Sequence, residues 1–203
     1  CCQSSDMNFA TSRRKAAAES STRAGAADIA AWIAFGLPQD AAEMVKNFRK
    51  LGFAPRLFVA QGAADADFIA RVGQDAEYAV GIAAYDRRAR TRGNAQFAPA
   101  FAKRWSAEPG HLAAEGYAAA KILEEAVRRA ASLEQERLRE TLAALETETP
   151  LGAYQVDRSG AQLAARPLLV QIVRGRRNIV WPEAYATAKW QPYLSWDARK
   201  PMK

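Results

Sequence analysis

Residue types able to support catalysis or to bind metals are scarce in this chain of 203 residues. His111 is its single histidine, and Cys1 and Cys2 are its only cysteines. A Cys/His metal site needs more ligands than these, and a Ser-His-Asp set needs partners that the spacing does not supply. His111 also opens an expected helix, where a structural, hydrogen-bonded role is favoured. We therefore expect no enzyme activity, no metal site and no cofactor.

Basic residues are in excess and give the chain a formal net charge of +7. The connector over residues 86–94 contains Arg87, Arg88, Arg90 and Arg92, and further basic residues follow Leu151. Clustered arginines can bind phosphates, nucleic acid or an anionic membrane surface. No nucleic-acid-binding motif accompanies them here, so the favoured interpretation is a solvated connector and a solvated basic surface.

The strongest local pattern is a strand that runs directly into a helix. Residues 32–35 form a short apolar run bounded by Gly36 and Pro38, which predicts a buried strand. Apolar residues then recur at helical spacing over 39–51, and Gly52 provides a stop signal. The turn between them lies at the carboxyl end of the strand, where open α/β folds bind ligands.

Strands and helices continue to alternate up to about residue 85. We predict strands at 57–60 and 78–85, with a short helix at 65–72 between them. Strands and helices in this order favour a parallel sheet with right-handed crossovers.

The second half of the chain has a different pattern. Helices are predicted at 96–105 and 111–131, and a third helix is expected to begin after a cap at Ser132. Antiparallel hairpins are then expected from the strand-like runs 153–157, 167–173 and 178–181. The tail over 183–203 has aromatic residues without a period, and we expect it to pack back as irregular chain.

The two ends of the chain carry little pattern. Residues 1–25 are expected to be a poorly ordered leader, and their polar start lacks the apolar region of a signal peptide. No apolar run approaches the ~20 residues needed to span a membrane. Cys1 as a lipid-bearing cysteine is the minor alternative to an arbitrary fragment start.

The order of these elements resembles the periplasmic solute-binding proteins of ABC importers for branched-chain amino acids and related amides. Five segments carry the resemblance, in family order: 36–42, 50–55, 107–120, 149–160 and 167–182. The resemblance covers residues 26–196 but only the carboxyl-terminal half of the family's length. It implies an α/β fold, part of a two-lobed type I periplasmic-binding-protein fold. Residues 26–85 and 151–182 would then form a partial second lobe, and 86–150 a helical segment of the first lobe.

The resemblance also implies where a ligand would bind. In the family, the turns that follow these strands face a cleft between the lobes. The expected ligand-binding residues are therefore Phe35, Gly36, Leu37 and Gln61. Family members commonly have an acid near the position of Gln61 that pairs with the ligand's ammonium group. A neutral amide cannot supply that charge pairing, which leaves an α-amino acid ligand in doubt.

The function implied by the resemblance is non-catalytic ligand capture for an ABC importer in the periplasm, with the transporter permease as partner. We expect the chain alone to be incompetent in binding, because first-lobe contacts are missing. We also expect the helix over 111–131 to expose apolar surface and to favour self-association. The alternative is a stand-alone basic α/β module that binds nucleic acid or an anionic membrane surface.

Overall fold

The computed structural model of the chain describes residues 29–199, which divide into two compact units. The first unit contains residues 29–83, 169–181 and 187–199 of the described chain, and the second contains Ala84–Leu168 and Pro182–Ala186. The expected leader over 1–25, with both cysteines, lies outside the described residues.

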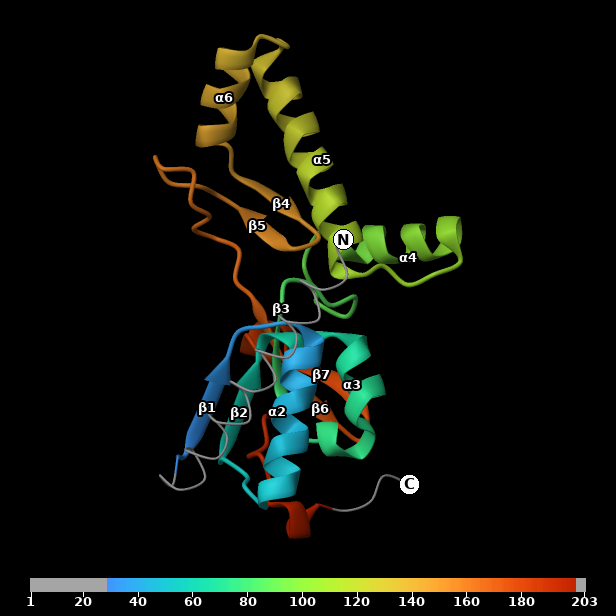
Figure 1. Ribbon diagram of the computed structural model, residues 1–203. Coiled ribbons are helices and arrows are strands. Elements are labelled where there is room, and N and C mark those ends of the chain that lie inside the picture. The colour runs from blue at the N-terminus through green and yellow to red at the C-terminus, as the bar shows by residue number, and fades with distance from the viewer. Residues whose placement is uncertain (1–28, 200–203) are drawn as a thin grey trace, which may run out of the picture. The chain divides into compact units, whose positions relative to one another are not determined.

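The first unit is built on a five-stranded sheet with the order β1-β2-β3-β6-β7 (Figure 1). Strands β1 (Ala31–Ala34), β2 (Leu57–Ala60) and β3 (Val80–Ala83) are parallel. Strands β6 (Leu168–Val173) and β7 (Arg176–Trp181) form the antiparallel hairpin expected near the end of the chain. The predicted α/β fold with a parallel sheet is confirmed.

Helices α2 (Pro38–Leu51) and α3 (Ala66–Val72) lie side by side on the sheet (Figure 1). Both helices were predicted, and the residues at their ends explain why the local sequence was sufficient to predict them. Pro38 occupies the first turn of α2, where the N–H that it lacks is not needed. Gly52 ends α2 in the left-handed conformation, with φ of 63°. The Asp65 side chain caps α3 by accepting the backbone N–H of Asp67.

Strand β1 differs from the buried strand that the sequence predicts. It is an edge strand in the sheet order, and its residues alternate between exposed and half-buried. Ile33 is 62% exposed, whereas Trp32 on the other face packs edge-on against Phe48, with ring centroids 5.1 Å apart. A short apolar run is typical of a central strand, but only the sheet order decides whether both faces are covered.

An aromatic cluster forms the core of the first unit. Phe48 from α2 and Phe58 from β2 are fully buried, with ring centroids 5.2 Å apart. Tyr193 from the tail packs on Phe58 at 5.6 Å, and the Trp196 indole N–H donates to the Phe53 carbonyl at 2.8 Å. The described part of the tail contains only short 3-10 turns, at Glu183–Tyr185 and Trp196–Ala198.

The second unit contains helices α4 (Asn94–Trp105), α5 (His111–Ala130) and α6 (Gln135–Ala144). All three were predicted, but the cap of α6 is Glu134 rather than Ser132. The Glu134 carboxylate accepts two backbone N–H groups of the first turn, which lowers its pKa. Across residues 29–199, no helix combines the length and the apolar character that a bilayer span requires.

Residues 151–168 correct the expected division of the chain. Strand β5 (Gly152–Tyr154) pairs with β4 (Thr147–Thr149) in a separate two-stranded sheet, not with the later strands. The second unit therefore extends to Leu168, whereas the expected boundary lay near 151. The reason is local, because the Thr149 hydroxyl donates to the Gly152 carbonyl at 2.8 Å and closes a tight β4–β5 turn.

Candidate ligand-binding site

Two turns leave the carboxyl end of the parallel sheet next to each other. β1 and β2 pair in parallel with Ala34 opposite Ala60, so the residues that follow each strand emerge side by side. The first turn contains Phe35, Gly36 and Leu37, and the second is the 3-10 turn Gln61–Ala64. All four residues expected to bind a ligand therefore lie at the carboxyl end of one sheet, where open α/β folds bind ligands.

Gly62 sets how closely these two turns approach. A Cβ atom added at Gly62 would lie 2.6 Å from the Pro38 nitrogen and closer still to the carbonyl group of Leu37. Backbone atoms cannot swing away as a flexible side chain can, so only glycine permits this contact. No local pattern indicates this requirement, because Leu37 and Gly62 meet only in the folded sheet.

The side chains at these turns are available to a ligand. Phe35 is 75% exposed and Leu37 is 51% exposed, and both are apolar. Gln61 is also exposed, and its amide makes no hydrogen bond to any residue within 29–199. The two turns together offer an apolar surface and one free amide.

The carboxylates closest in sequence to these turns already have partners. Asp40 accepts the backbone N–H of Leu37 at 2.9 Å, and Asp65 caps α3. Each carboxylate thus has one oxygen engaged in holding the local backbone. The exposed side chains of the two turns, Phe35, Leu37 and Gln61, are themselves apolar or neutral.

The described residues hold no cluster of three or more His, Cys, Asp or Glu side chains that could bind a metal ion. His111 begins α5 in the second unit and is exposed. The chemistry that the two turns support is binding, through van der Waals contact and hydrogen bonding.

Asp40 is expected to hold the first turn in its conformation. Replacing Asp40 with alanine removes the hydrogen bond to Leu37 and a negative charge from the first turn of α2, which should lower the free energy of unfolding by about 1 kcal/mol. Gln39→Ala, an exposed change in the same turn, is the control and should have little effect. Equal losses in the two variants, measured by urea denaturation, would show that the Asp40 contact is unimportant.

Comparison with known proteins gives the class to which this chain belongs. A family model described as periplasmic binding protein matches residues 15–177, most of the chain. The chain therefore belongs to the periplasmic binding protein family, as the resemblance predicted.

Solved structures agree with this fold. The leucine-binding protein LivK of Thermotoga maritima matches with a TM-score of 0.69 and 21% identity, over 79% of this chain and 46% of that protein. LivJ of Streptococcus pneumoniae, solved in complex with isoleucine, matches with a TM-score of 0.60 and 17% identity, over 75% and 45%. A solute-binding protein of R. palustris in complex with benzoate matches with a TM-score of 0.62 and 16% identity, over 89% and 48%. The chain thus spans about half the length of these proteins.

Proposed function

We propose that this chain is part of a non-catalytic solute-binding protein of an ABC importer, acting in the periplasm with the transporter permease as its partner. Family membership supports the class. The observation that carries the proposal is the side-by-side placement of the Phe35–Leu37 turn and the Gln61 turn at the carboxyl end of the sheet. Phe35, Gly36, Leu37 and Gln61 would then line one wall of the ligand site.

The ligand class follows from the chemistry of that wall. Phe35 and Leu37 suit the apolar side chain of a branched-chain amino acid or of a related amide. Gln61 can donate to and accept from a neutral polar group, but it lacks the charge that would pair with an ammonium group. We therefore favour small branched amides over zwitterionic amino acids for this wall.

The chain alone should bind such ligands weakly. Phe35 is mostly exposed, so water competes for each contact and little of a ligand's surface is buried. We expect dissociation constants in the millimolar range or weaker, about −4 kcal/mol, whereas a micromolar complex requires about −8 kcal/mol. A second lobe that covers the ligand would supply the difference.

A nuclear magnetic resonance titration of the isotope-labelled chain tests this proposal. Isobutyramide, leucine, isoleucine and valine are added separately while the backbone amide signals are followed. We expect shifts at residues 35–37 and 61–62, with isobutyramide giving the largest. Gln61→Ala should remove the preference for the amide, whereas Gln74→Ala, which changes another exposed glutamine, should leave it unchanged.

Two outcomes would contradict the proposal. Shifts confined to other parts of the chain would show that these turns do not form the site. A saturable micromolar isotherm that Gln61→Ala abolishes would show that the chain already carries a complete site, against the expected incompetence.

A further inference from the structure

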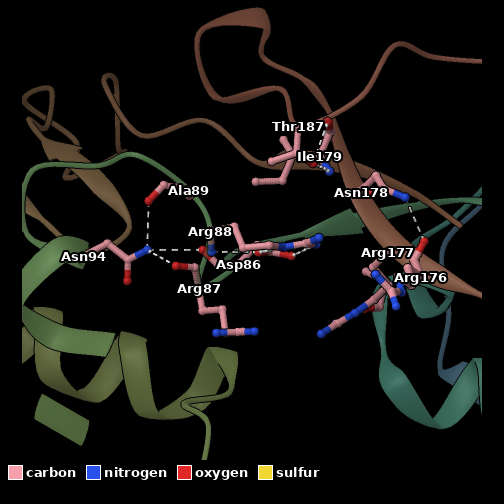
Figure 2. A network of polar contacts seen from close by, with 11 residues as sticks. Asp86, Arg87, Arg88, Ala89, Asn94, Arg176, Arg177, Asn178, Ile179 and Thr187 are labelled. Atoms are coloured by element: carbon pink, nitrogen blue, oxygen red, sulfur yellow. Dashed lines mark hydrogen bonds and ion pairs between the residues drawn. The ribbon is translucent and has the colours of Figure 1, made fainter. Parts of the chain in front are cut away.

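The connector over residues 86–93, here called the arginine loop, is held rigidly by a buried asparagine. Asn94 is 2% exposed, and its amide nitrogen donates to the carbonyls of Arg87 and Ala89 at 2.9 and 2.8 Å (Figure 2). Its amide oxygen accepts from the Tyr85 hydroxyl at 2.7 Å. Burial, with Asp86 and Glu108 nearby, raises the pKa of Tyr85 to about 12, so the phenol remains a donor. The loop therefore has a fixed backbone rather than that of a solvated linker.

The far end of the arginine loop is fixed as well. The buried Thr91 hydroxyl donates to the Pro150 carbonyl at 2.6 Å. Gly93 lies directly against the same segment, because a Cβ added there would be 2.8 Å from the Pro150 nitrogen. Both ends of the loop are thus attached to the second unit. The backbone at its exposed arginines is therefore fixed before any ligand binds.

The arginines of this loop differ in how well their charges are balanced. Arg88 forms a two-pronged ion pair with the buried carboxylate of Asp86, at 2.9 Å for each contact. Arg87 lies 3.4 Å from Glu108 in a pair whose members are both more than half exposed. Arg90 and Arg92 are exposed and form no ion pair with any residue within 29–199. The loop therefore carries two arginines that have no ion-pair partner in the described chain.

These two arginines line a cavity of about 590 Å³ within the second unit. The small apolar side chains of α4 form its other wall, namely Ala95, Ala98, Pro99 and Ala102. Glu108 is its single acidic lining residue. The volume lies in the range typical of small-molecule sites, and the lining combines a compact apolar wall with excess positive charge.

A larger cavity in the same unit has a more acidic lining. It measures about 620 Å³ and is lined by Arg92, Lys121 and Arg129 together with two acidic residues, Glu146 and Glu148. Lys121 pairs with Glu124, and Arg129 shares Glu125 with Arg128, so both lining groups already have an acidic partner. The arginine loop is therefore the better candidate for an anion.

We propose that the cavity beside the arginine loop binds a small oxyanion, with a carboxylate or phosphate group held by Arg90 and Arg92 and a compact apolar body against α4. Guanidinium groups recognise such anions through paired, charge-assisted hydrogen bonds. A rigid loop lowers the entropy lost on binding, since the anchored backbone does not have to be ordered by the ligand. This site lies wholly in the second unit and does not depend on the turns at Phe35 and Gln61.

A pair of ligands with the same shape and different charge tests the proposal. Isobutyrate is titrated into the labelled chain alongside its neutral counterpart isobutyramide, and inorganic phosphate is titrated separately. We expect isobutyrate to shift the amide signals of residues 87–95 in a saturable way, and phosphate to compete with it. Isobutyramide should leave those signals unchanged, even where it shifts residues near Gln61. The failure of either site is therefore visible independently of the other.

Matched double variants separate this site from general charge attraction. Arg90→Ala with Arg92→Ala should weaken isobutyrate binding at least tenfold, since both anion contacts are lost. Arg158→Ala with Arg166→Ala removes the same charge from exposed positions of the same unit and should leave the affinity within twofold. Arg90→Lys with Arg92→Lys keeps both charges and should retain part of the affinity. Equal losses in the two alanine pairs, or the absence of saturable shifts at 87–95, would overturn the proposal.

Discussion

Gly62→Ala is expected to destabilise the first unit by about 3 kcal/mol or more. The added methyl group would meet the backbone of Leu37 and Pro38, which forms the start of α2 and cannot move without displacing that helix. The variant should also weaken any ligand shifts at residues 35–37, because the two turns would be pushed apart. Urea denaturation followed by far-ultraviolet circular dichroism measures the loss.

Gly116→Ala is the matched control and should have the opposite sign. Gly116 lies within α5, and a Cβ added there meets nothing within 4 Å. Alanine in an exposed helix interior is better than glycine by about 0.5–1 kcal/mol, so the second unit should become more stable. If Gly62→Ala proves as harmless as Gly116→Ala, the tight contact between the turns is not a feature of the protein in solution.

The isolated chain is expected to self-associate through α5. Leu112, Gly116, Ala119 and Leu123 are exposed at helical spacing and form an apolar stripe on this helix. Leu112 is 73% exposed and Leu123 is 51% exposed. Fully burying one leucine side chain is favourable by about 1.5–3 kcal/mol, so association that buries this stripe is expected to be strongly favourable. Sedimentation should show concentration-dependent oligomers, and a hydrophobic dye should bind.

A pair of charged variants locates this association. Leu112→Glu with Leu123→Glu should raise the dissociation constant of the oligomer at least tenfold, because two carboxylates would have to be buried. Leu133→Glu with Leu163→Glu changes two exposed leucines outside the stripe and should have a much smaller effect. A chain that remains monomeric at high concentration and binds no dye would contradict the prediction.

Local signals were sufficient for much of the fold. Pro38, Gly52 and the apolar spacing between them define α2 without reference to the rest of the chain. Strand β4 was missed because Thr147, Glu148 and Thr149 have no apolar pattern, and only pairing with β5 makes them a strand. The exposure of β1 was also missed, since its position at the sheet edge is a property of the strand order.

The candidate sites also combine features that could be predicted from the sequence with features that only the folded chain shows. Phe35 and Gln61 could be named because the family resemblance implies that the turns after these strands face the ligand, and the parallel pairing of β1 and β2 brings both turns to the same end of the sheet. The need for glycine at position 62 depends on a contact with Leu37, 25 positions earlier, and has no local signal. The arginine loop looked like a solvated linker because the hydrogen bonds that fix it come from Asn94 and Pro150.

The position of β1 at the sheet edge bears on the shape of the binding wall. One side of β1 pairs with β2, and within the described chain its other side has no strand partner. A segment that added to that side in parallel would reach the end of the sheet beside Phe35, on the side away from Gln61. Its own following loop would then emerge next to Phe35, whose side chain is mostly exposed. Strand addition at this edge would therefore extend the binding wall beyond Phe35 as well as lengthen the sheet.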